Sequence, residues 1–317
     1  MGISLSSNNN ENHFKILKKD LNVIDVRGDI RNINFLEKNI KKFKPDIVFH
    51  LAAQAIVSTS YKYPIKTIET NVLGTLNLLS VLKEIKKKCT VVLITSDKCY
   101  KNVEVKRGYK ENDELGGDDF YSASKASAEL VINSFYKSYI KDKNNLLKIA
   151  TARAGNVVGG GDWSENRLIP DCVKCWSRKQ KVNVRNPNAT RPWQHVLEAL
   201  SGYLHLAQKL NDDKKINGQS FNFSNNTIKN FTVLKFIIGI KKYWKTASWK
   251  ATKQTSFHES TLLQLNSTKA KKILNWKNKL RLSETIKLVG EWYKAYYLTN
   301  KKTILTKDQI LMYMKKK

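Results

Sequence analysis

Short apolar runs alternate with helical segments through the first half of the chain. We expect strands at 23–26, 47–51, 91–94 and 148–153, and helices at 34–43, at 65–86 and from Tyr121 onward. This alternation predicts parallel strands, because a parallel pair must be joined by a crossover that usually contains a helix. The run at 91–94 is apolar at every position, as is typical of a strand buried on both faces. The sequence therefore predicts an α/β protein.

The length and composition permit a large buried core. With 317 residues, 41% of them hydrophobic, the chain is long enough for one large α/β unit and a smaller appended lobe. Its four cysteines are typical of a reducing compartment, so we expect a cytoplasmic protein. The amino end has no apolar core of a signal peptide, and the apolar segment at 231–240 is too short to cross a bilayer. We therefore expect neither secretion nor a membrane partner.

Tyr121 and Lys125 are four residues apart in a segment with helical character, YSASKASAELVI. This spacing places both side chains on one helix face, so a cation lies beside a phenol. A neighbouring cation lowers the pKa of a tyrosine, which suits Tyr121 as the base for a substrate hydroxyl during hydride transfer. The alternative is a surface tyrosine and lysine without a chemical role, because Tyr-x-x-x-Lys is common by chance.

Polar residues directly follow the most apolar of the expected strands. Ser96, Asp97 and Lys98 lie at its carboxyl end, where open α/β sheets bind their ligands. Asp97 is a candidate acid and Lys98 a candidate base. Burial and a nearby cation such as Lys125 would favour neutral Lys98, whereas Asp97 would oppose it. We therefore expect this segment to share one site with Tyr121.

Both segments resemble the catalytic motifs of extended short-chain dehydrogenases/reductases, and more narrowly those of nucleotide-sugar 4,6-dehydratases. Other motifs of that family occur in the same order: 28–31 (GDIR), 48–54 (VFHLAAQ), 70–75 (TNVLGT), 152–163 (ARAGNVVGGGDW), 167–171 (RLIPD), 185–187 (RNP), 191–198 (RPWQHVLE) and 291–293 (EWY). Dehydratases of dTDP-sugars carry Thr-Asp-Glu in place of Ser96-Asp97-Lys98, so the lysine indicates the branch that acts on CDP-glucose. The resemblance implies a Rossmann-type doubly wound parallel sheet with a smaller mixed substrate-binding lobe.

For activity, the resemblance implies NAD-dependent dehydration of CDP-glucose to CDP-4-keto-6-deoxyglucose. Tyr121 would take the C4 hydroxyl proton, with Ser96 hydrogen bonding nearby and Lys125 lowering the tyrosine pKa. Lys98 would then remove the C5 proton while Asp97 protonates the departing C6 hydroxyl. A nucleotide-sugar epimerase or a decarboxylase of this fold is the alternative among enzymes, although Asp97 and Lys98 argue against both. A catalytically inactive sugar-nucleotide-binding or scaffold protein is the alternative outside enzymology.

The resemblance also implies which residues contact NAD. Asp29 and Ile30 match the family's pair at the adenine, although Asp29 is also suited to capping the next helix. Leu51, Ala52 and Ala53 end a strand where small residues let the dinucleotide approach the backbone, with core packing as the alternative. The other expected cofactor residues are Gln54, Asn71 as a supporting residue, Thr95, Tyr121 and Lys125.

Family members begin with a strand, a Gly-x-x-Gly-x-x-Gly turn and a helix, whose backbone amides hold the NAD pyrophosphate. Residues 2–5 resemble the family's second strand and 22–26 its third. We therefore expect 1–155 to be a NAD-binding Rossmann domain that carries the catalytic residues, lacks this first β-α unit and binds NAD weakly. We expect 156–317 to be mainly a nucleotide-sugar-binding lobe, with the chain crossing between the two parts.

Substrate recognition is expected after Arg153. Asn156 and Arg191 resemble the family's pair at the nucleotide diphosphate, and a planar guanidinium suits phosphate. Further candidates, each with a purely structural role as its alternative, are Arg167, Leu168, Ile169 and Arg185. We interpret His195 as part of the scaffold, because the proton transfers already have candidate residues.

The formal charge of +30 raises the alternative of a nucleic-acid or anionic-membrane binding module. The lysines, however, are dispersed in pairs such as 18–19 and 271–272, without a helix-turn-helix, RNP-like or zinc-finger pattern. We therefore expect a solvated basic surface and no specific nucleic-acid partner. The expected protein partner is a second copy of the chain, because family members usually dimerise through the two long helices that 65–86 and 121–139 resemble.

Cys172 and Cys175 form a lone Cys-x-x-Cys motif. No second cysteine pair or histidine cluster accompanies it. We interpret the two thiols as small packing groups in an amphipathic helix over 168–176, and we expect no metal.

Overall fold

The computed structural model describes residues 1–6, 11–142, 145–225, 231–252, 262–299 and 302–316. Its centre is a four-stranded parallel sheet in the order β3 (Ile47–His50), β4 (Cys89–Ile94), β5 (Leu147–Ala154) and β9 (Ser220–Phe223). The strands β1 (Gly2–Ser4) and β2 (Asp25–Arg27) form a separate parallel pair. The prediction of an α/β fold with parallel strands is confirmed, although the strand expected at 23–26 begins two residues later.

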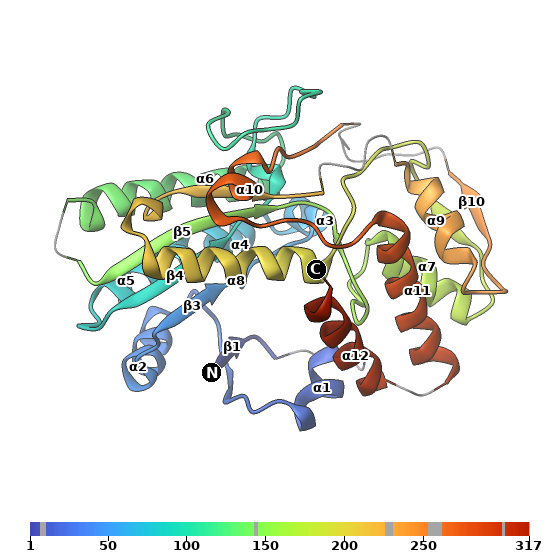
Figure 1. Cartoon of the computed structure of the whole chain (residues 1–317), viewed down its shortest axis with the longest axis horizontal. Coiled ribbons are helices and arrows are strands. Elements are labelled where there is room, and N and C mark those ends of the chain that lie inside the picture. Colours follow the sequence, from blue (N-terminus) through green and yellow to red (C-terminus); the bar gives the residue numbers. More distant parts are fainter. Residues whose placement is uncertain (7–10, 143–144, 226–230, 253–261, 300–301, 317) are drawn as a thin grey trace.

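Helices cover both faces of the four-stranded sheet (Figure 1). On one face, Val91 and Leu93 of β4 pack against α5 (Gly74–Lys83) and α6 (Phe120–Phe135). On the other face, Val92 packs against α8 (Val196–Asp212) and α10 (Thr268–Leu274). Because alternate residues of β4 point to opposite faces, its unbroken apolar sequence fills two cores.

The helix expected over 65–86 is formed by three joined segments. These are α4 (Pro64–Ile68), a π-helical turn at Glu69–Leu73 and α5. Asn71 and Thr75 lie in and beside this turn and are buried, so the turn brings polar side chains to the inner face of the helix. The helix α6 likewise continues as a π-helical turn, Tyr136–Ile140.

The second half of the chain builds a smaller lobe with its own apolar core. Buried Trp176, Phe236 and Trp292 lie at its centre, contributed by α7 (Leu168–Ser177), α9 (Val233–Lys241) and α11 (Leu282–Leu298). The helix predicted at 168–176 is confirmed as α7, and Cys172 is buried in this core. The remaining strands are β6 (Val157–Val158), β7 (Val182–Val184), β8 (Gln194–His195) and β10 (Trp249–Ala251). The remaining helices are α1 (His13–Leu17), α2 (Ile33–Phe43), α3 (Val57–Lys62) and α12 (Lys302–Lys315). Short 3-10 turns lie at Lys18–Asp20, Asp97–Cys99 and Lys214–Ile216.

The two halves of the chain are interleaved. The strand β9 comes from the second half but pairs with β5 of the first. At the other end of the molecule, His13 Nε2 lies 3.0 Å from Thr306 Oγ1, so α1 is hydrogen bonded to α12. The domain boundary at 155 stays a prediction. Within the described part of the chain, no helix has both the length and the apolar character that a membrane crossing requires.

Candidate active site

The segment after β4 forms a compact polar turn. The Ser96 hydroxyl accepts a hydrogen bond from Lys98 N at 3.2 Å and donates one to Asp97 Oδ1 at 2.9 Å. Ser96 and Asp97 are buried, while Lys98 is half-buried. Gly155 packs so closely that a Cβ there would lie 2.1 Å from Asp97 Oδ2. A glycine is therefore required for the acid to occupy this place.

Tyr121 and Lys125 lie on the inner face of α6, both buried. The helix begins beside the polar turn, where Asp119 caps it by accepting a hydrogen bond from Ser122 N at 3.0 Å. Tyr121 lines the same cavity as Ser96, Asp97 and Lys98. The structure thus brings together four of the five residues expected to be catalytic, with Lys125 one helical turn beyond Tyr121.

The pKa of Tyr121 differs from the expectation. Burial raises it to about 12, and hydrogen bonding by Ser96 offsets this only in part. The predicted lowering by Lys125 is not found: Lys125 is not among the groups that shift the pKa of Tyr121, and burial lowers the pKa of Lys125 itself to about 8. The Tyr121 phenol is therefore neutral at neutral pH.

Asp97 has the electrostatic character of an acid. Its carboxyl group is buried, and this burial raises its pKa, although Lys98 and the Ser96 hydroxyl act in the opposite direction. A raised pKa favours the protonated carboxyl group, which is the form that can give a proton to a leaving hydroxyl. The structure therefore fits the acid role expected for Asp97.

Behind the polar turn lies a buried ion pair that sequence reasoning missed. Arg153 Nε donates to Glu129 Oε1 at 2.8 Å, and both side chains are 3% exposed. Thr95 Oγ1 donates to the same carboxylate at 2.5 Å. The hydroxyl of Thr95, a residue expected to contact the cofactor, is therefore hydrogen bonded to this ion pair. Glu129 lies eight residues after Tyr121 on α6, and that helical spacing on a buried face was the signal in the sequence.

Six of the expected cofactor residues follow β2 or β3: Asp29 and Ile30 follow β2, and residues 51–54 follow β3. Leu51 is 53% exposed, with Ala52 and Ala53 half-buried beside it. Asn71 Oδ1 accepts from Gln54 N at 2.8 Å and its amide donates to Ser124 Oγ at 2.8 Å, which supports the position of this loop against α6. The Gln54 side chain is engaged with Thr67 and the Ile56 amide.

Asp29 and Ile30 are tied into the protein. Arg31 donates to the Asp29 carboxylate, with one N–H···O distance of 2.7 Å. Ile30 is 8% exposed and packs against Gly74. Asp29 also accepts a hydrogen bond from Arg31 N at 2.9 Å, within the turn before α2. The helix-capping alternative is wrong, because Asn32 caps α2 by accepting from Phe35 N. Contact of either residue with an adenine stays a prediction.

The hydrogen bonding of the Lys125 ammonium group indicates whether the site is suited to a dinucleotide. Its ammonium group donates one long hydrogen bond, 3.4 Å to Ile94 O, and no other described residue accepts from it. A buried ammonium group has three donors and is costly to leave unpaired. Ribose hydroxyls would satisfy these donors, so the residues present fit the ribose of NAD.

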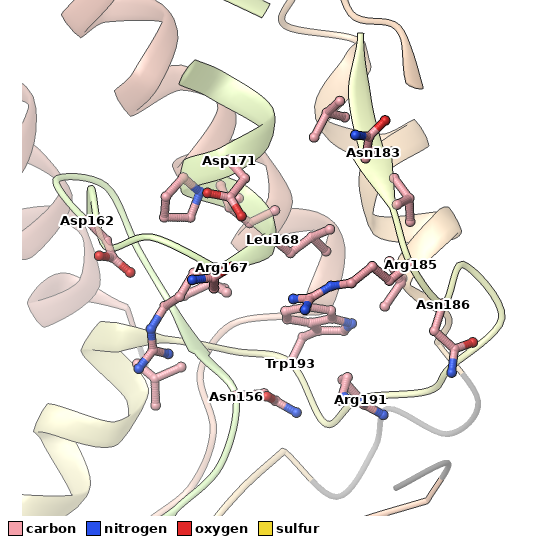
Figure 2. A pocket seen from close by; sticks show the side chains of 18 of the residues that line it. Asn156, Asp162, Arg167, Leu168, Asp171, Asn183, Arg185, Asn186, Arg191 and Trp193 are labelled. Atoms are coloured by element: carbon pink, nitrogen blue, oxygen red, sulfur yellow. The ribbon is translucent and has the colours of Figure 1, made fainter. Parts of the chain in front are cut away.

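A trough leads from the catalytic residues into the smaller lobe. Six residues line both its catalytic end and its far end. Two are Val157 and Asn166, and the other four, Asn156, Arg167, Arg185 and Arg191, are residues expected to bind substrate. Figure 2 shows these side chains around the lower part of the far end. Asn156 has a φ of 38°, in the left-handed region that asparagine tolerates, which places this residue at a sharp turn after β5. Three guanidinium groups in one trough are suited to a diphosphate.

The other expected substrate residues lie at the far end. Leu168 faces the cavity at the start of α7, while Ile169 lines it and is also packed in the apolar core of the lobe. His195 lies away from both cavities, and its Nδ1 accepts a hydrogen bond from Leu197 N at 3.3 Å at the start of α8. That placement agrees with a scaffold role. No cluster of three potential metal ligands occurs among the residues that the structure describes.

Comparison with known proteins decides the family. The family model described as GDP-mannose 4,6 dehydratase matches residues 2–289. A CDP-glucose 4,6-dehydratase from Salmonella typhimurium is 42% identical over 291 residues, which are 90% of this chain and 81% of that protein. The chain belongs to the GDP-mannose 4,6 dehydratase family. The expectation of an NAD-dependent nucleotide-sugar 4,6-dehydratase is thereby confirmed at the level of the family.

More distant relatives agree with the fold of this dehydratase. A UDP-glucose 4-epimerase from Mycoplasma genitalium is 25% identical over 93% of this chain and 89% of its own. The structure of a dTDP-glucose 4,6-dehydratase from Bacillus anthracis in complex with NAD superimposes with a TM-score of 0.74 at 21% identity, covering 92% of this chain and 85% of that one. The predicted Rossmann-type fold is confirmed.

Proposed function

We propose that this dehydratase converts CDP-glucose into CDP-4-keto-6-deoxyglucose, with NAD as the hydride carrier. One observation carries the proposal: a single trough joins Ser96, Asp97, Lys98 and Tyr121 to three arginines. A nucleotide sugar has matching parts, a reacting hexose at one end and a diphosphate next to it. CDP-glucose is favoured because the relative with 42% identity carries that activity in its name.

The first stage is oxidation at C4. The arginines hold the diphosphate, which places the hexose beside Tyr121 and Ser96. Tyr121 accepts the C4 hydroxyl proton, and Ser96 hydrogen bonds to the same oxygen. Lys125 and the backbone at 51–53 would hold NAD, which would supply the hydride acceptor for C4 and later the hydride donor for C6. Burial raises the pKa of Tyr121, so a positive charge beside the phenol would favour its role as a base.

The second stage is the loss of water. The C4 ketone acidifies C5, so Lys98 can remove that proton while the C5–C6 double bond forms. Asp97 gives its proton to the departing C6 hydroxyl, which leaves as water. Return of the proton from Lys98 to C5, together with the hydride that NAD would supply to C6, would complete the product. Tyr121 releases the C4 hydroxyl proton to solvent and Asp97 takes one up, so the residues return to their starting state. The base and the acid are adjacent in the chain at the end of β4.

Turnover of CDP-glucose tests the proposal. With added NAD, we expect the protein to form the 4-keto-6-deoxy sugar, detected by its absorbance in alkali. Tyr121→Phe should lower kcat by about 10²–10⁴-fold, because the proton acceptor is lost while the ring remains. Tyr139→Phe is the matched control, since Tyr139 lies 44% exposed beyond the end of the same helix, and this variant should keep full activity.

Two results would count against the proposal. Tight binding of CDP-glucose without turnover would favour the catalytically inactive binding protein instead. Turnover that Tyr121→Phe leaves unchanged would remove Tyr121 from the mechanism.

We further propose that the enzyme is a cytoplasmic homodimer. The large apolar side chains of Ile65, Leu73, Phe120 and Leu130 are 49–75% exposed on neighbouring helical segments, α4 to α6, that the family resemblance implies as the dimer contact. Burying such side chains against a second copy would remove them from water. The free cysteines Cys89, Cys99, Cys172 and Cys175 are compatible with the reducing cytoplasm.

A further inference from the structure

The far end of the trough forms a chamber separate from the catalytic end. Residues that line it but not the catalytic cavity include Leu168, Asp171, Val182, Asn183 and Trp193. The guanidinium groups of Arg167, Arg185 and Arg191 lie between this chamber and Tyr121. This inference rests on the proposed function: if the hexose reacts at Tyr121 and the diphosphate lies among the arginines, the nucleoside base lies in the chamber.

The walls of the chamber suit a flat ring. Leu168, Val182, Val184 and Val233 contribute aliphatic side chains, and Trp193 contributes an indole. Such walls hold any base through apolar contact and do not distinguish one pyrimidine from another. Selectivity must therefore come from the polar groups of the chamber.

Among the residues that the structure describes, four side chains with a carboxyl or amide group line the chamber but not the catalytic cavity: Asp162, Asp171, Asn183 and Asn186. Asp162 Oδ1 already accepts a hydrogen bond from Ser164 N at 2.9 Å, within its own loop. The two asparagine amides both donate and accept, so they can pair with either type of group on a base. An ionised carboxylate only accepts, which makes Asp171 the discriminating group.

Asp171 projects from the first turn of α7 towards the chamber (Figure 2). Its carboxyl group is half-buried. Burial raises its pKa, while Lys174 and Arg185 favour the charged form and Glu165 opposes it. The backbone N–H of Asn166 also favours the charged form and so acts to lower this pKa.

We propose that Asp171 accepts a hydrogen bond from the exocyclic amine of cytosine and so selects cytidine diphosphate sugars. A carboxylate pairs well with that amine. Uracil and thymine carry a carbonyl oxygen at the same place, so two acceptors would face each other. A site that provides a hydrogen bond discriminates strongly against an analogue that cannot form that bond. An apolar pocket discriminates less strongly between ligands that differ only in size.

Calorimetric titration of the protein with CDP and UDP tests this selection. Wild-type protein should bind CDP about tenfold or more tightly than UDP. Asp171→Asn should lower CDP affinity about tenfold, because a neutral amide oxygen is a weaker acceptor than a carboxylate. UDP affinity should be unchanged or improved, because the amide can also donate to the uracil carbonyl. Glu165→Gln is the control: it removes a neighbouring negative charge from a residue outside the chamber, and it should keep the preference for CDP.

A ligand change avoids any dependence on how the variant folds. The diphosphate of the 2-pyrimidinone riboside lacks the exocyclic group of cytosine, and wild-type protein should bind it about tenfold more weakly than CDP. Equal binding of this analogue and CDP would overturn the inference.

The remaining outcomes separate the inference from the proposed function. Failure of wild-type protein to bind any of these diphosphates would contradict the nucleotide-sugar trough itself. A CDP preference that survives Asp171→Asn would overturn the role of Asp171 and leave the proposed function standing. If Asp171→Asn lowered CDP and UDP affinity equally, the role of Asp171 in base selection would also be overturned, since Asp171 would then act through Arg185 at the diphosphate.

Discussion

At the scale of single residues, Asp97 combines a proposed catalytic role with a cost to stability. Burial raises the pKa of its carboxyl group, so ionisation near neutral pH works against the folded state. Asp97→Asn keeps the shape of the side chain and removes its titratable carboxyl proton. We expect this variant to lose dehydration by about 10²–10⁴-fold and to melt at a higher temperature than wild type at neutral pH. Turnover assays and thermal unfolding measure the two effects.

The pH dependence distinguishes this cause from a change of packing. The folded protein holds the Asp97 proton to a higher pH than the unfolded chain, whose aspartate pKa is about 3.9. The stabilisation from this proton is complete below that value and is lost as pH rises through the folded pKa. The difference in melting temperature should therefore grow with pH. A difference that stays constant across pH would contradict the explanation.

At the scale of secondary-structure elements, the ion pair between Glu129 and Arg153 joins α6 to β5 behind the catalytic turn. Burial alone would raise the pKa of Glu129, but the charge of Arg153, together with hydrogen bonds from Arg153 and from two threonine hydroxyls, Thr95 and Thr151, holds it below its ordinary value. Glu129→Gln leaves Arg153 as a buried unpaired charge, so we expect a loss of about 3–5 kcal/mol in the free energy of unfolding. Urea denaturation measures this loss.

An exposed ion pair in the same protein supplies the control. Arg107 and Asp113 approach to 2.8 Å, with side chains 49% and 21% exposed. Asp113→Asn should cost only about 0–1 kcal/mol, because solvent screens the pair. The stabilisation that the ionised Glu129 carboxylate gives to the folded protein should also depend on pH. It should be complete above the unfolded glutamate pKa of about 4.3 and should be lost as pH falls through the lower pKa of Glu129 in the folded protein. Similar costs for the two substitutions would show that burial does not set the strength of these pairs.

At the scale of the whole molecule, the net charge of +30 opposes the proposed dimer. Two copies repel each other over a distance set by the ionic strength, about 30 Å at 0.01 M and about 8 Å at 0.15 M. We therefore expect the dimer to tighten by about tenfold between these salt concentrations, as measured by analytical ultracentrifugation. Leu130→Lys adds a charge to the apolar contact, and this variant should be a monomer at both salt concentrations. A dimer that weakens as salt is added would contradict an apolar contact between basic copies.

The sequence by itself determined the α/β fold and the composition of the polar turn. Strand and helix periodicity, together with an uninterrupted apolar strand at β4, are properties of neighbouring residues, so they can be read without knowing the fold. The position of Ser96, Asp97 and Lys98 at a sheet edge followed from the same pattern, because parallel strands share the edge at which they end. The four-residue spacing likewise placed Tyr121 and Lys125 on one helix face.

Only the tertiary structure decided the electrostatics and the shape of the trough. The pKa of Tyr121 is raised because distant segments exclude water from it, and a sequence pattern carries no measure of that exclusion. Glu129 meets Arg153 across 24 residues, and Arg185 faces the same cavity as Tyr121 across 64. Asp171 lies in the helix that the sequence predicted, but its direction into a chamber depends on how α7 packs in the smaller lobe. Such contacts arise from the packing of elements that are far apart in the chain.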